Sequence, residues 1–145
     1  MRAVVTRVKS ASVTIDGQIT ASIDNGFLVL LGVHKNDTPE IAAWVADRIC
    51  GLRVFEDENG KMNVSPENAG ASILIVSQFT LYADVSSRRP GFSDAARPDL
   101  AIPLYNSVID YCRDKGFTVA TGEFGADMQV ASVNDGPVTI VIDKN

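Results

Sequence analysis

Two short apolar segments constrain the fold of this 145-residue chain more than any other feature. FLVLLGV spans residues 27–33, and SILIVSQFTLY spans residues 72–82. A strand with one face in water alternates apolar and polar side chains, whereas an unbroken apolar run predicts a strand that is buried on both faces. We therefore expect a sheet built around these two segments, with other elements packed over it.

Alternation and turn signals predict further strands around this core. Val4, Thr6 and Val8 alternate with charged or small residues, and the pairs Asp16-Gly17 and Asn25-Gly26 indicate tight turns. The other predicted strands are Gln18–Ile23, Leu52–Phe55, Phe117–Thr121, Met128–Val133 and Val138–Ile142. So many strands in a short chain indicate a largely antiparallel sheet that curls toward a barrel.

Two segments carry helix signals. The first follows Asp37–Glu40, which supplies an N-cap, an early proline and an acidic residue, and apolar residues then repeat at helical spacing. The second is predicted from about residue 99 to 115, with Pro103 near its first turn and Gly116 as its C-cap. We expect one α+β domain over residues 1–145, with two main helices and a compact, β-barrel-like antiparallel or mixed sheet.

The charge balance limits the partners of the chain. Its 13 Lys and Arg residues against 18 Asp and Glu give a net charge of −5. An acidic surface argues against broad nucleic-acid binding, although a local basic patch could still hold one end of an RNA. A weak basic stripe, Arg2, Arg7 and Lys9, lies on the first strand. No apolar run is long enough to span a membrane, and we expect a cytoplasmic protein with no membrane partner.

Most familiar metal and cofactor chemistry has no motif here. His34 is the only histidine and is predicted in a surface loop, so no Ser-His-Asp or Cys-His apparatus is expected. Cys50 and Cys112 form neither a metal motif nor a disulfide framework, and we interpret both as thiols packed in a core. No glycine-rich phosphate loop is present. We expect no metal and no cofactor.

Polar residues gather at the end of the most apolar strand. Ser77, Gln78 and Thr80 bring two hydroxyls and an amide to one strand end, and burying such groups without partners costs several kcal/mol. Simple alternation between the two faces of a strand accounts for each residue alone. The set as a whole suits a site that holds a carbonyl oxygen or a developing oxyanion.

Two other segments each have more than one interpretation. NDGPVT, residues 134–139, is first of all a tight turn between strands, where Pro137 could also take the cis form. Arg88 and Arg89, with Arg97 nearby, stand out in an acidic chain. They form either a solvated surface loop or a patch that contacts the phosphates of an RNA end.

The motifs of the chain, taken together, resemble one family. SQFTLYAD at 77–84 and NDGPVTI at 134–140 resemble the two signature motifs of the D-aminoacyl-tRNA deacylase family. The opening MRAVVTRV, the LVLLGV strand, LRVFEDENGKMN at 52–63 and FGADMQV at 124–130 are also similar to the family. The resemblance covers the whole chain in order. It implies a compact β-barrel-like α+β fold and an enzyme that hydrolyses D-amino acids, and also glycine, from mischarged tRNA.

The resemblance also implies how the site is assembled. The family acts as a homodimer with its active site at the subunit interface, and its SQxxT motif lines the site for the aminoacyl end of the 3′-terminal adenosine. That role carries over to Ser77, Gln78, Phe79 and Thr80. A Gly-cisPro pair, here Gly136-Pro137, reaches in from the partner subunit. Its rigid carbonyls leave no room for the side chain of an L-amino acid.

The implied chemistry needs few acid–base groups from the protein. We expect backbone N–H groups near Phe79 and Thr80, with the Gln78 amide, to hold the substrate and polarise the ester carbonyl. The 2′-hydroxyl of the terminal ribose would assist the attacking water. Thr80 has no base beside it in the sequence pattern, so we interpret it as a positioning group and not as a covalent nucleophile.

One segment departs from the family pattern, and two other functions stay open. Gly91 stands in the basic loop where the family usually has a serine, so no hydroxyl contact is expected there. Phe124–Met128 is either a pocket wall or core, and core is the preferred interpretation. The first alternative function is a small esterase for free D-amino-acid esters without tRNA specificity, which should carry its own base. The second is a module that binds charged tRNA ends without turnover.

Overall fold

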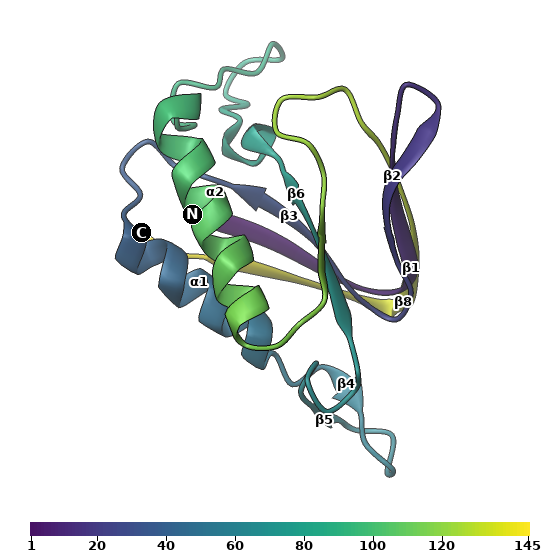
Figure 1. The fold of residues 1–145 in the computed structure, drawn as a ribbon. Coiled ribbons are helices and arrows are strands. Elements are labelled where there is room, and N and C mark those ends of the chain that lie inside the picture. The colour runs from purple at the N-terminus through teal and green to yellow at the C-terminus, as the bar shows by residue number, and fades with distance from the viewer.

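The computed structural model describes all residues, 1–145, and shows two helices packed over a strongly twisted sheet (Figure 1). The helices are α1 (Pro39–Gly51) and α2 (Pro98–Asp114), and a short 3₁₀ helix, η1 (Phe79–Tyr82), follows the sixth strand. The strands are β1 (Arg2–Ile15), β2 (Gln18–Ile23), β3 (Gly26–Gly32), β4 (Phe55–Glu56), β5 (Met62–Val64), β6 (Ser72–Ser77), β7 (Val119–Thr121) and β8 (Gln129–Asp143). The expected α+β domain with two main helices is confirmed.

Strand β1 organises the main sheet because three other strands pair with it. It runs antiparallel to β2, β3 and β8. β3 pairs with β6 in parallel, and so does β6 with β7. Parallel neighbours need a long connection, and α1 and α2 lie in these two connections. The sheet is therefore mixed and curls toward a barrel. Of the two predicted alternatives, an antiparallel or a mixed sheet, the structure shows the mixed one.

Both faces of β3 and β6 are buried, as their apolar runs predict. Phe27 and Val29 of β3 face the helices, inside the larger apolar cluster. Leu28 of β3 and Leu74 of β6 face the opposite side, where β1 and β2 close over them in a second cluster. Burial on two sides holds β6 firmly, and it therefore fixes the position of the polar residues at the end of that strand.

Four predictions about elements need correction. The strand predicted over residues 72–82 ends at Ser77, and residues 79–82 form η1 instead. The strand predicted over residues 52–55 is only Phe55–Glu56. Pro103 is the sixth residue of α2 and lies beyond its first turn, so the helix gives up one backbone hydrogen bond there. The two closing strands predicted at 128–133 and 138–142 are one continuous strand, β8.

The NDGP segment forms a wide bulge inside β8. Val8 pairs with Asn134 and Thr6 with Thr139, so residues 135–138 stand opposite Arg7 alone. The predicted tight turn between two strands is therefore wrong, because the chain does not reverse. The bulge leaves Gly136 and Pro137 exposed, and the peptide bond between them is cis, as the family resemblance implies.

Gly26 lies where β3 passes closest to β6. A Cβ atom at this position would lie 1.8 Å from the carbonyl oxygen of Ser72, so the backbone itself would have to move. We expect Gly26→Ala to lower the free energy of unfolding by more than about 3 kcal/mol, measured by urea denaturation. The matched control is Gly51→Ala at the end of α1, where a Cβ meets nothing within 4 Å. It should stay within about 1 kcal/mol of the parent. Equal stability of the two variants would contradict this prediction.

Candidate active site

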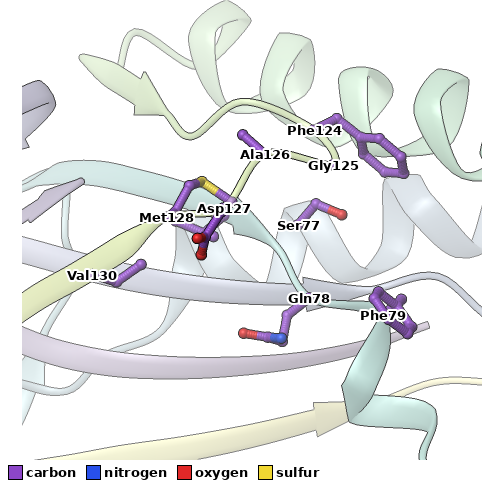
Figure 2. A pocket seen from close by; sticks show the side chains of 10 residues that line it. Ser77, Gln78, Phe79, Phe124, Gly125, Ala126, Asp127, Met128 and Val130 are labelled. Carbon is purple, nitrogen blue, oxygen red and sulfur yellow. The ribbon is translucent and has the colours of Figure 1, made fainter. Parts of the chain in front are cut away.

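A cavity of about 280 Å³ lies beyond the end of β6 (Figure 2). One wall is Val76–Phe79, and the other is the loop Phe124–Met128 together with Val130 of β8. Figure 2 shows Ser77 and Gln78 pointing to different sides of their strand, as simple alternation requires. The structure thus brings three of the four predicted site residues, Ser77, Gln78 and Phe79, to one cavity. Thr80 does not line it.

The interpretation of Phe124–Met128 as core is incomplete, because Phe124 and Met128 pack against the apolar clusters while the segment also forms a pocket wall. The Phe124 ring does pack toward Tyr105, with 6.2 Å between ring centroids, but the whole loop lines the cavity opposite Ser77. Asp127 supplies the only charged side chain among the lining residues, and it is exposed. The sequence signal for this wall was the family-like FGADMQV segment, since apolar content alone made it look like core.

Gln78 and Thr80 hold each other in position. The Gln78 Nε2 group donates a hydrogen bond to the Thr80 Oγ1 atom at 2.6 Å. No base contacts the Thr80 hydroxyl in the chain. Phe79 and Thr80 begin η1, and the N–H groups that open a helix have no partner within it. The strand end therefore offers free main-chain donors next to a fixed amide.

Tyr105 of α2 supports the strand just before the cavity. Its buried hydroxyl donates a hydrogen bond to the carbonyl oxygen of Ile75 at 2.9 Å, two residues before Ser77. Burial raises the pKa of Tyr105 to about 12. The contact ties the end of β6 to the helical layer, which makes the cavity wall a rigid part of the fold.

Tyr105 should make stability depend on pH in the alkaline range. The folded protein favours its neutral phenol, because the folded pKa, about 12, lies above the ordinary value near 10. This contribution to the free energy of unfolding is complete below about pH 10 and is lost as the pH rises through 12. We expect Tyr105→Phe to flatten that loss and to cost about 1 kcal/mol at neutral pH. Urea denaturation at pH 8, 10 and 11 measures the free energy of unfolding of the wild type and of Tyr105→Phe. If this free energy falls equally with pH in the two proteins, the prediction is contradicted.

The basic loop lies beside the cavity. Asp84 and Gly91 exchange two backbone hydrogen bonds, of 2.8 and 2.9 Å, which close the base of the loop that carries Arg88 and Arg89. Both arginines are exposed and neither pairs with a carboxylate. Gly91 therefore acts through its backbone, and a Cβ there would meet nothing within 4 Å.

Arg7 fixes the bulge of β8 from behind. The sequence placed it in a basic surface stripe, but the structure buries it with only 5% of its surface exposed. Its Nη1 group donates to the carbonyl oxygen of Val54 at 2.6 Å, and its Nε group donates to the carbonyl oxygen of Asp135 at 3.2 Å. The Asp135 carboxylate lies 3.4 Å from the same Nε atom. Charge patterning could not identify this role, because its partners are distant in sequence.

Gly136 and Pro137 lie far from the cavity of their own chain. The bulge stands opposite Arg7, which pairs with Phe27 at the start of β3. Ser77 pairs with Leu31, four residues further along the same strand. Four residues of strand span about 13 Å, so one protomer does not bring the pair and the SQFT residues together.

The remaining candidates for chemistry lie elsewhere. His34 is half-buried instead of lying in an exposed loop, and its ring packs edge-on against Tyr82 at 5.1 Å between centroids. No three His, Cys, Asp or Glu side chains come together as metal ligands would. None of the helices combines the length and the apolar character that crossing a membrane requires.

Comparisons with known proteins identify the family to which the chain belongs. A family described as D-Tyr-tRNA(Tyr) deacylase matches residues 4–143. Proteins called D-aminoacyl-tRNA deacylase from Exiguobacterium sibiricum and Thermus aquaticus are 54% and 52% identical to this chain. The first alignment covers 99% of this chain and 100% of the relative, and the second covers 100% and 96%.

Two solved structures have the same fold. One, titled "c-Myc DNA Unwinding Element Binding Protein", is 40% identical with a TM-score of 0.95, over 100% of this chain and 99% of that chain. The other, titled a probable eukaryotic D-amino acid tRNA deacylase, is 16% identical with a TM-score of 0.85, over 99% and 98% of the two chains.

The structure is a small α+β domain, and its candidate site presents the Ser77 hydroxyl and the Gln78 amide to one cavity. The family match over nearly the whole chain and the identity to its relatives then decide which enzyme class this is. The chain belongs to the D-Tyr-tRNA(Tyr) deacylase family, a family of hydrolases. The family resemblance and the expectation of a hydrolase are confirmed.

Proposed function

We propose that this chain hydrolyses the ester bond between a D-amino acid, or glycine, and the 3′-terminal ribose of tRNA. The products are the free amino acid and the tRNA. The strongest support comes from one wall of the cavity. Ser77, Gln78 and Phe79 of the family motif line this wall, and they bring an amide and free main-chain donors to it. Such an enzyme acts where translation takes place, so we propose the cytoplasm as its compartment.

The chemistry of the site follows from its donors. The N–H groups of Phe79 and Thr80 would donate hydrogen bonds to the ester carbonyl oxygen and stabilise the negative charge that grows on it as water attacks. The Gln78 amide, held by its bond to Thr80, would orient the aminoacyl group. The 2′-hydroxyl of the terminal ribose would assist the attacking water. An aminoacyl ester is already activated, so aligned water and a stabilised oxyanion suffice.

Aromatic and basic residues beside the cavity suit an RNA end. Phe79 exposes 53% of its surface, and its ring stands edge-on to that of Phe92 at 5.1 Å between centroids. Exposed aromatic rings stack on unpaired bases such as a terminal adenine. Arg88 and Arg89 extend from the same loop as Phe92 and would neutralise the neighbouring phosphates.

A second copy of the chain would complete the cavity. Strand β8 pairs only with β1, and its other edge is open along 15 residues. Val133 and Val141 on it expose 55% and 63% of their surface. A long, apolar, uncovered edge strand favours association, and an isologous homodimer would bury it. The same contact would carry the exposed Gly136 and Pro137 of one protomer toward the cavity of the other.

The proposed dimer supplies the chiral selection. The buried Arg7 holds Asp135, the residue just before Gly136 and Pro137, through its carbonyl oxygen and its carboxylate. Carbonyls fixed in this way would occupy the space that the side chain of an L-amino acid requires, whereas a D-amino acid or glycine would fit. Discrimination would then come from exclusion of the wrong substrate, which explains how a site with few contacts can be selective.

Matched D- and L-tyrosyl-tRNA test this function. We expect the purified protein to deacylate the D form and to spare the L form. Release of tyrosine from neither substrate would overturn the proposal, and equal rates on both would remove the chiral role of Gly136 and Pro137. D-tyrosine methyl ester separates the alternative esterase: turnover of this free ester with a kcat/KM equal to that of D-tyrosyl-tRNA would favour the alternative.

A further inference from the structure

The two cysteines, 62 positions apart in the sequence, meet in the structure. Cys50 lies in the last turn of α1 and Cys112 in the last turn of α2. The Cys50 thiol donates a hydrogen bond to the Cys112 Sγ atom, with the two sulfur atoms 3.5 Å apart. Both are free thiols. The sequence interpretation of two separate core thiols is thus incomplete, because the helix pair brings them into direct contact.

We propose that Cys50 and Cys112 form a redox-modification site, a dithiol that closes to an intramolecular disulfide under peroxide and reopens with a thiol reductant. The sulfur atoms already touch, so closing the bond requires side-chain rotation with little movement of the two helices. α1 and α2 are also tied nearby, where the Tyr111 hydroxyl donates to the Asp47 carboxylate at 3.0 Å. This second contact keeps the helix ends in the register that presents one thiol to the other.

The two thiols differ in solvent exposure and in the pKa of the sulfur, and both differences favour oxidation at Cys50. Cys112 is fully buried, whereas Cys50 is half-buried and can be reached by a small oxidant. Hydrogen bonding with the Cys112 thiol lowers the pKa of Cys50, although burial and the Asp47 carboxylate oppose this effect. A thiolate is the nucleophile in thiol oxidation. Cys50 is therefore the attacking cysteine and Cys112 the resolving one.

The reaction balances with hydrogen peroxide as the oxidant. The Cys50 thiolate attacks one peroxide oxygen, the O–O bond breaks, and protonation of the leaving hydroxide gives water and a sulfenic acid on Cys50. The Cys112 sulfur then attacks the Cys50 sulfur, the S–O bond breaks, and the Cys112 proton leaves with the hydroxide as a second water. Two thiols are oxidised by two electrons, and the peroxide is reduced. A dithiol reductant reverses the change by exchange.

The disulfide should stabilise the protein and leave its catalysis intact. Cys112 follows Tyr105 by seven residues, about 10 Å along α2, and Tyr105 already lies on the near side of the cavity wall. In Figure 1 the C-terminal ends of α1 and α2 lie together, away from the end of β6 and η1. A crosslink that closes a loop of this length is expected to raise Tm by roughly 5–10 °C.

The test treats the reduced protein with a series of peroxide concentrations. The chain has two cysteines in all, so the count of free thiols and the intact mass are unambiguous. We expect both thiols to disappear together, with loss of two hydrogen atoms and no added oxygen. The product should remain uncrosslinked between chains on a non-reducing gel and show the higher Tm. D-tyrosyl-tRNA deacylation should be unchanged, and dithiothreitol should restore both thiols and the original Tm.

Cys50→Ser and Cys112→Ala are the matched controls. Each variant keeps one thiol, and peroxide should not raise the Tm of either variant. The remaining thiol should gain oxygen atoms or react with peroxide more slowly than the wild-type pair does. The proposal is overturned if the wild-type thiols survive peroxide that oxidises the single-cysteine variants. It is also overturned if the wild-type product carries added oxygen or joins two chains. These readouts do not depend on the deacylase assay, so their failure is distinct from failure of the proposed function.

Discussion

Deacylation should slow by about a hundredfold to ten-thousandfold when the 2′-hydroxyl of the terminal adenosine is replaced by hydrogen and the D-amino acid is esterified to the 3′-oxygen. The cavity contains no histidine, cysteine or lysine, so the protein offers little to assist a water molecule. If the ribose hydroxyl provides that assistance, its loss affects the chemical step. The fall should appear in kcat with little change in KM, because a single hydroxyl adds little to the binding of a whole tRNA end.

Asp127 is the one competing base. Its carboxylate is the only titratable side chain that lines the cavity. The RNA-assisted mechanism predicts that Asp127→Asn lowers kcat less than removal of the ribose hydroxyl does. The opposite ranking, with the deoxy substrate turned over at nearly the normal rate, would assign the role of base to Asp127. Single-turnover rates with excess enzyme measure the chemical step in both cases.

Gly136→Ala should reduce the ratio of D- to L-tyrosyl-tRNA deacylation by about a hundredfold or more, because small displacements in a site have effects of this size. Gly136 has a φ angle of +126°, which L residues rarely adopt. A Cβ atom there would lie 3.0 Å from the Val138 nitrogen and 3.1 Å from the Arg7 Nη2 atom. The bulge must therefore shift, and the wall that excludes the L side chain shifts with it.

Two further variants make the Gly136 result interpretable. Gly91→Ala adds a methyl group on the exposed basic loop, where it meets nothing within 4 Å, and should leave the ratio unchanged. Arg7→Lys keeps the positive charge but cannot donate both of the hydrogen bonds that Arg7 makes to the carbonyl oxygens of Val54 and Asp135. It should lower the ratio without strain at Gly136. A folded Gly136→Ala protein with wild-type selectivity would contradict the exclusion model.

Much of the fold could be predicted because it depends on local patterns. The unbroken apolar runs gave β3 and β6 as buried strands, and N-cap, proline and periodicity signals gave both helices nearly to the residue. The NDGP segment shows where this fails: its residues have strong turn chemistry, but pairing of both flanks with β1 keeps the strand extended and turns the segment into a bulge. Long-range pairing outweighed a local preference there.

The site was predictable only to the extent that its residues lie together in the sequence. Ser77–Phe79 share one strand end, so polar residues after an apolar run pointed to them. The opposite wall, Phe124–Met128, has the composition of a core segment, and only the fold places it over Ser77. Arg7 and the Cys50–Cys112 contact likewise depend on partners that tertiary folding supplies.

The central claim is that each cavity is completed by the neighbouring protomer, and mixing two defective variants tests it most directly. Gln78→Ala damages the cavity, and Gly136→Ala damages the segment that is donated across the interface. If the protein is a homodimer of this kind, a mixed dimer contains one cavity with both parts intact. Random exchange of subunits should then leave about a quarter of all cavities fully intact, so the D-to-L ratio of the mixture should rise above that of Gly136→Ala alone. A mixture whose D-to-L ratio stays at that of Gly136→Ala alone, or a protein that sediments as a monomer under assay conditions, would contradict the account.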